Sequence, residues 1–193
     1  MKLTLSRAAL AAAAIAFVVI VLGAYVRLSH AGLGCPDWPG CYGELTWPAE
    51  SHEIERANQA FPERPVETAK AWKEMVHRYL AGILVLLVVF INYLAWKPGS
   101  GSRQSRATAG FLLVLILFQA ALGMWTVTLK LKPLIVMAHL LGGLATFSLL
   151  LWLGWRSRPV PAGHDNLSYA PFRSAVLAGL LVLVVQLALG GWT

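Results

Sequence analysis

Five apolar stretches, each about as long as a bilayer is thick, dominate the pattern of the sequence. Residues other than Asp, Glu, Lys and Arg run without interruption over 8–26, 79–96, 107–129, 133–155 and 174–193. A bilayer core needs about 20 apolar residues per helix, so each stretch predicts a transmembrane helix. The first stretch, which follows Lys2 and Arg7, is also compatible with a signal peptide. Its length, and the lack of a small-residue cleavage site before Arg27, favour an uncleaved helix.

The pattern therefore predicts an all-α integral membrane protein, in which residues 1–155 form a four-helix transmembrane bundle. We expect its spans at about 8–26, 75–96, 107–129 and 134–155, with an outer loop over 27–73. A linker over 156–173 then leads to 174–193, expected to be the first helix of a second, similar bundle. Because the sequence stops at Thr193 without a polar flank, we expect the second bundle to be truncated and the chain to be a piece of a longer protein.

Composition agrees with a membrane protein. Hydrophobic residues make up 58% of the chain and charged residues 13%, against about 25% charged in soluble domains. This excludes a soluble enzyme, a disordered chain and a nucleic-acid partner. The net charge of +7 is instead expected to set topology, because basic residues concentrate in cytoplasmic loops.

Basic residues predict the orientation. The amino end, 97–106 and 156–173 together carry eight basic residues and one acid, Asp165, so we place them in the cytoplasm. The long segment 27–73 and the turn at 130–133 then lie outside, although Lys130 and Lys132 run against the rule.

The outer loop 27–73 holds seven of the nine acidic residues and five prolines. We expect it to be too short to bury a core of its own and to lie across the mouth of the bundle as a lid. Cys35 and Cys41 both belong to it. A structural disulfide, a redox-active dithiol and a metal site are all open for this pair, although its spacing is not that of a Cys-x-x-Cys motif.

His77 and His139 are the strongest candidates for chemistry. Each falls near the outer start of a predicted span, so both are expected at a similar depth on two different helices. Two such imidazoles can grip a heme iron between them, and an ionisable group within a span is a functional candidate by default. Small or polar residues share their surroundings: Gly142, Gly143 and Thr146 after His139, and Gln119, Gly123 and Thr126 on the preceding span. Tight helix packing explains those glycines equally well, but not the histidines.

Glu74 lies three residues before His77 and therefore shares its helix face. It could point into the same cavity and shuttle protons. Alternatively it favours the helix dipole or pairs with Lys70 or Arg78. Arg78 and Arg27 could bind heme propionates, or extend toward lipid headgroups.

An internal repeat links two spans. Residues 119–126 and 186–193 share six of eight identities, including Gln and Trp. Membrane proteins built by duplication show such repeats, although chance matches among Leu, Ala and Gly are the alternative.

Several motifs together resemble the amino-terminal half of the heme A synthase family. They are Leu22-Gly-Ala-Tyr-Val-Arg27, Gly32-Leu-Gly-Cys-Pro-Asp-Trp-Pro-Gly-Cys41, Glu74-Met-Val-His-Arg-Tyr-Leu-Ala-Gly82, Gln119-Ala-Ala-Leu-Gly123 and His139. The resemblance implies eight transmembrane helices in two bundles, and oxidation of a ring methyl of heme O to the formyl group of heme A for cytochrome c oxidase. It also implies a multi-pass protein of the bacterial inner membrane.

Carried onto this sequence, the resemblance makes His77 and His139 the axial ligands of the substrate heme. Glu74 becomes the catalytic carboxylate and Cys35–Cys41 the outer-loop pair. A heme b cofactor is expected in the second bundle, so this part alone could be inactive. Membrane lipid, heme O synthase, oxidase assembly factors and a second copy of the chain are the partners it suggests.

Two other functions are compatible with this sequence. A bis-histidine b-type cytochrome carrying electrons needs the two histidines but neither Glu74 nor the cysteines. A helix-packing assembly subunit needs none of them. Identifying the pigment extracted from the protein would distinguish the synthase, the electron carrier and the assembly subunit.

Overall fold

The computed structural model describes residues 2–98, 102–158 and 173–192, and within these the fold is helical, as predicted. The helices are α1 (Lys2–Leu28), α2 (Ser51–Ala60), α3 (Thr68–Trp96), α4 (Arg103–Thr128), α5 (Pro133–Arg156) and α6 (Arg173–Trp192). Helices α1, α3, α4 and α5 are long and apolar enough to cross a membrane. These four correspond to the first four predicted spans.

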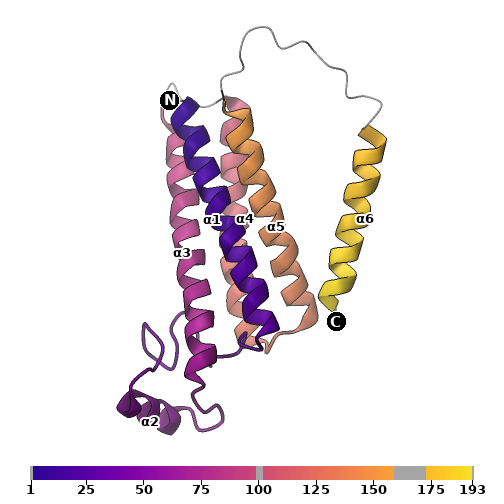
Figure 1. Cartoon of the computed structure of the whole chain (residues 1–193). Helices are drawn as coiled ribbons and strands as arrows, with labels where there is room; N and C mark the ends of the chain where they lie inside the picture. The colour runs from indigo at the N-terminus through magenta and orange to yellow at the C-terminus, as the bar shows by residue number, and fades with distance from the viewer. Residues whose placement is uncertain (1, 99–101, 159–172, 193) are drawn as a thin grey trace.

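The four long helices form a square bundle (Figure 1). Helix α1 packs against α3 and α5, and α4 packs against the same two helices. The pairs α1/α4 and α3/α5 therefore lie across the diagonals, and within the described residues neither diagonal pair is in direct backbone contact. The centre of the bundle therefore lies between α3 and α5.

Alanines make the close packing of α1 possible. Ala9, Ala12, Ala13 and Ala16 are almost fully buried and contribute to a core with Val88, Ile91, Leu112 and Leu150 of the other helices. Their small side chains let the backbones approach closely, as is usual in membrane bundles. Large apolar side chains such as Leu86 and Val114 remain exposed on the outer surface, where lipid would cover them.

The connections alternate between the two ends of the bundle (Figure 1). The beginning of α1 and the α3–α4 connection lie at one end. The α4–α5 turn and residues 29–67 lie at the other, which matches the two groups of loops that the basic residues predicted. We call these the amino-terminal end and the Cys-loop end.

The carboxy-terminal part is only partly described. Residues 159–172, which include most of the predicted linker 156–173, lie outside the described residues. Helix α6 packs against α5, and its role as the first helix of a second bundle stays a prediction.

The outer loop forms a small core, but only together with α3, which agrees with the prediction that it has no core of its own. Helix α3 begins at Thr68, so the connection is shorter than expected, and it contains α2. Cys35, Cys41, Tyr42 and Ala57 are buried together with Met75 of α3. The connection builds this core by borrowing the first turns of α3. Most of it lies beyond the end of α3, not across the mouth of the bundle (Figure 1).

Candidate functional site

The two predicted ligand histidines lie on the diagonal helices of the bundle. His77 belongs to α3 and His139 to α5. In each ring Nδ1 is buried and has no hydrogen-bond partner among the described residues. Both histidines as a whole are half-buried.

A glycine on each flanking helix makes room for one ring. A Cβ atom on Gly23 of α1 would lie 3.0 Å from His77 Cε1, and one on Gly123 of α4 would lie 3.6 Å from His139 Cε1. His77 therefore leans onto α1 and His139 onto α4. Any side chain larger than glycine at Gly23 would displace the His77 ring.

Gln119 adds a third buried polar group. Its amide nitrogen has no partner among the described residues, and its side chain occupies the space where a Cβ atom on Gly142 of α5 would stand. Gly143, by contrast, faces Ile20 of α1 at an ordinary contact distance of 3.9 Å. A Cβ atom would therefore fit at Gly143, and close packing does not require glycine there, whereas Gly142 accommodates Gln119.

The hydroxyl groups of Thr126 and Thr146 do not donate hydrogen bonds to the histidine site. Thr126 Oγ1 donates to the Gly123 carbonyl at 2.6 Å and Thr146 Oγ1 to the Gly142 carbonyl at 2.8 Å. Both hydroxyl groups therefore satisfy their own helices.

These groups fit a heme better than a bare metal ion. Within the described residues no group of three or more His, Cys, Asp and Glu side chains could hold a metal. Two imidazoles alone suit an iron whose other ligands come from a porphyrin. Each buried polar atom without a partner costs about 1–3 kcal/mol and calls for an explanation, and a ligand between the rings would supply one.

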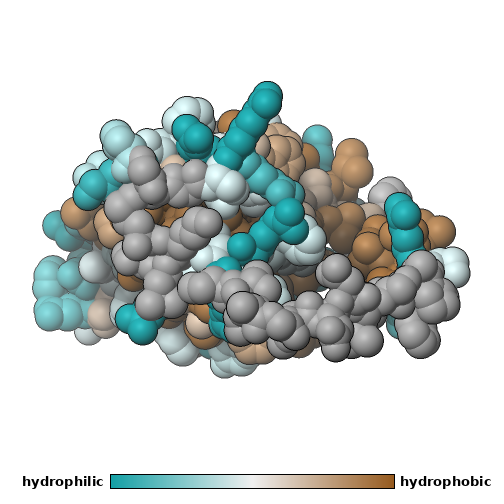
Figure 2. Space-filling view, turned by 90° about the horizontal axis from the view of Figure 1, so that it is seen from above, coloured by the Kyte–Doolittle hydropathy of each residue, from teal (hydrophilic) through white to brown (hydrophobic). Residues whose placement is uncertain are grey.

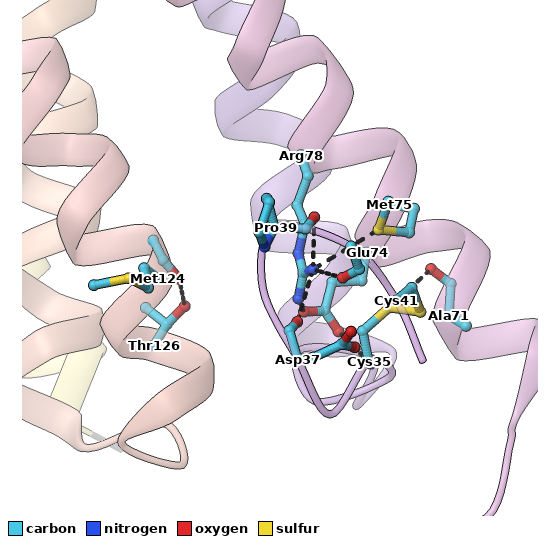
Figure 3. Close-up of polar contacts among 12 residues, drawn as sticks. Cys35, Asp37, Pro39, Cys41, Ala71, Glu74, Met75, Arg78, Met124 and Thr126 are labelled. Atoms are coloured by element: carbon cyan, nitrogen blue, oxygen red, sulfur yellow. Dashed lines mark hydrogen bonds and ion pairs between the residues drawn. A yellow bond between two sulfur atoms is a disulfide. The ribbon is translucent and has the colours of Figure 1, made fainter. Parts of the chain in front are cut away.

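Glu74 faces the Cys loop (Figure 3). Its side chain is 5% exposed and pairs with Arg78 through Oε1. Oε2 accepts a hydrogen bond from the backbone N–H of Cys35 at 3.0 Å. Among the alternatives for Glu74, pairing with Arg78 is confirmed.

Arg78 fastens the loop to α3. Its Nη1 donates to the carbonyl oxygens of Asp37 at 3.0 Å, Pro39 at 3.3 Å and Gly40 at 2.5 Å. The side chain is 12% exposed, so extension toward lipid headgroups was wrong for this residue. Arg27 lies exposed in the last turn of α1.

Cys35 and Cys41 form a disulfide. It closes the short loop whose carbonyls Arg78 binds. Gly34, just before it, touches the backbone of α3, since a Cβ atom there would come within 2.7 Å of the Lys70 carbonyl carbon. Only glycine allows this approach.

Sequence reasoning missed two residues that shape the loop. The Asp37 carboxylate accepts hydrogen bonds from the backbone N–H groups of Tyr42 at 2.6 Å and Gly43 at 2.7 Å. Tyr42 donates its hydroxyl to the Pro65 carbonyl at 3.2 Å, and burial raises the pKa of its phenol. The Pro-Asp-Trp-Pro-Gly composition indicates a turn, but not these partners.

The sequence is similar to a family of known proteins. Residues 6–193 match the family model COX15-CtaA, described as cytochrome oxidase assembly protein. The heme A synthase of Shewanella oneidensis is 50% identical over 91% of this chain and 52% of its own length. Those of Geobacillus kaustophilus and Rhodospirillum centenum are 29% and 32% identical, over 78% and 77% of this chain and 43% and 38% of their own lengths.

The chain thus spans about half the length of the curated relatives it matches. No solved structure matches it. The match over nearly the whole chain shows that it belongs to the cytochrome oxidase assembly family that contains the heme A synthases.

Proposed function

We propose that this chain is the substrate-binding half of a heme A synthase, which oxidises a ring methyl of heme O to a formyl group. The observation that carries the proposal is the diagonal pair His77 and His139, each backed by a glycine and each with a buried, unpartnered Nδ1. A porphyrin between α3 and α5 would place its iron between the two rings. The farnesyl tail of heme O is apolar and would enter from the lipid between neighbouring helices.

The net reaction adds one water oxygen to the methyl carbon and removes four electrons and four protons. The electrons go to an acceptor outside this chain. Heme b in the second half of the protein is the expected first carrier. The residues of this chain would orient the ring and accept protons.

Glu74 is the proposed proton acceptor. It lies one helical turn from His77, and its carboxylate faces the Cys loop. Arg78 offsets the cost of burying its negative charge. Arg27 and Arg78 are the proposed partners of the propionates, with Arg78 keeping its bonds to the loop.

The proposed setting is the bacterial inner membrane, with the amino terminus in the cytoplasm and the Cys loop outside. Heme O synthase as donor, oxidase assembly factors as acceptors and a homo-oligomer belong to the same proposal. They rest on the family and on the loop charges.

Pigment analysis tests the function. The chain is purified from a host that makes heme O, with the Shewanella oneidensis relative as positive control, and bound pigments are extracted and identified by mass. Heme O or heme A in the extract supports the proposal. Heme b alone would support the electron carrier, and a colourless chain beside a coloured control would contradict any heme role.

A further inference from the structure

The amino-terminal end of the bundle has an open surface cavity, lined by exposed residues, that the heme site does not involve. It has a volume of about 410 Å³ and is lined by Trp96 at the end of α3 and by Arg103, Arg106 and Ala107 at the start of α4. The two arginines are three residues apart on one helix and therefore share a face. The cavity consequently presents two guanidinium groups beside an aromatic ring.

No described acidic residue is near enough to neutralise this charge. Every described Asp and Glu lies between Asp37 and Glu74, at the Cys-loop end. Figure 2 looks onto the amino-terminal end and shows hydrophilic side chains around its rim.

The arginines of the cavity differ from their neighbours. Arg156 donates to Gln104 at 2.9 Å and lies over the Trp152 ring, and Arg158 lies over the Trp155 ring. The side chains of Arg103 and Arg106 make no hydrogen bond or ion pair with any described residue. Their charges are thus available to a ligand.

Two apolar tracks lead away from the cavity along the lipid-facing surface. On α4 the face of Arg103 and Ala107 continues with the exposed residues Phe111, Val114 and Phe118. On α3 the second track runs from Trp96 along the exposed residues Tyr93, Phe90 and Leu86. A negatively charged head with two apolar chains matches this arrangement.

We propose that the cavity is a binding site for an anionic phospholipid. Arg103 and Arg106 hold the phosphate, Trp96 lies at the level of the glycerol backbone, and the acyl chains follow α3 and α4. Arginine suits this role because its planar donors bind phosphate oxygens in pairs. Basic sites between helices at the cytoplasmic face are known to bind such headgroups. The proposal does not depend on the heme chemistry.

Native mass spectrometry of the purified chain tests the site. The chain is titrated with phosphatidylglycerol or phosphatidylcholine in mild detergent. We expect tighter binding of phosphatidylglycerol, and a loss of up to about thirtyfold in Arg103→Gln/Arg106→Gln. Arg103→Lys/Arg106→Lys, which keeps the charge, should retain part of the affinity and shows that the fold is intact.

The charge-matched control is Arg156→Gln/Arg158→Gln, which removes two charges from the same end. It should keep phosphatidylglycerol binding. Equal losses in both double variants would overturn the proposal, since net charge alone would then explain binding. Displacement of the lipid by millimolar inorganic phosphate would overturn it in favour of a site for free anions.

Discussion

The Glu74 carboxylate accepts a hydrogen bond at 3.0 Å from the backbone N–H of Cys35, a residue 39 positions earlier in the chain. The same carboxylate pairs with Arg78, whose guanidinium binds the carbonyls of the disulfide loop. One buried ion pair therefore joins the first helix turn before His77 to the outer loop. The proposed proton acceptor and the loop are held by the same contacts.

Two replacements of Glu74 should distinguish its role in the reaction from its role in stability. Glu74→Gln retains an acceptor for the Cys35 N–H, and we expect it to keep heme but to stop formyl formation in the full-length enzyme. Glu74→Ala should also lose formyl formation, and it should loosen the loop, because breaking a buried ion pair costs about 3–5 kcal/mol. Pigment extraction and thermal unfolding measure the two effects.

The control for Glu74 is Glu67→Gln, which alters an exposed carboxylate paired with Lys70. Glu67→Gln should change neither formyl formation nor the unfolding temperature. Normal heme A production by Glu74→Gln would remove the carboxylate from the proposed mechanism.

Loss of either histidine should change the iron ligation. We expect His77→Ala and His139→Ala each to convert a low-spin, bis-imidazole spectrum to a high-spin one, because one axial ligand is gone. The exposed His52→Ala is the control and should keep the low-spin spectrum. An unchanged spectrum in His77→Ala would show that another residue binds the iron.

Gly23→Leu should weaken heme binding although it replaces neither of the proposed ligand histidines. A side chain there meets the His77 ring, since even its Cβ atom would be 3.0 Å from Cε1. Gly110→Leu is matched in residue type, and a Cβ atom there meets nothing within 4 Å. Heme content per protein, measured by absorbance, should fall in the first variant only; equal content in both would mean that the ring moves freely.

Cys35→Ser/Cys41→Ser should destabilise the outer segment by about 2 kcal/mol, the value expected for closing so short a loop. Amide hydrogen exchange should increase around residues 35–75 and stay unchanged in the centre of the bundle. Treating the unaltered chain with a reductant should reproduce the change. Faster exchange throughout the bundle would assign the disulfide a wider role than the structure indicates.

Acid should weaken the start of α2. The Glu53 carboxylate accepts hydrogen bonds from the backbone N–H groups of Ala49 at 2.9 Å and Glu50 at 3.1 Å, and these bonds lower the pKa of Glu53 below its ordinary 4.5. Its contribution to stability is therefore complete above pH 4.5 and is lost as the pH falls through the lower folded value. Exchange protection of α2 should follow this fall, and Glu53→Gln should abolish the dependence.

The bundle could be predicted from the sequence because its signals are local. A run of about 20 apolar residues is sufficient to place a transmembrane helix. The number of residues between each histidine and the start of its span, at a rise of about 1.5 Å per residue, is sufficient to put His77 and His139 near the same end. Their placement on two diagonally opposite helices depends on the order in which the helices pack, which the pattern of hydrophobic residues does not contain.

The loop could not be predicted for the opposite reason. Its contacts join residues far apart in sequence, as with Cys35 and Glu74 or Tyr42 and Pro65. Helical periodicity placed Glu74 on the face of His77, but residues three apart are still rotated by about 60°. The nearby loop backbone and Arg78 decide where the carboxylate points.

The diagonal placement of α3 and α5 has a mechanical consequence. Neighbouring helices are already held by packing, whereas the backbones of this pair are not in direct contact within the described residues. A heme bound by both His77 and His139 would link α3 to α5. A ligand that binds only the folded form adds its binding free energy to stability. Filling the centre should therefore raise the unfolding temperature of all four helices together.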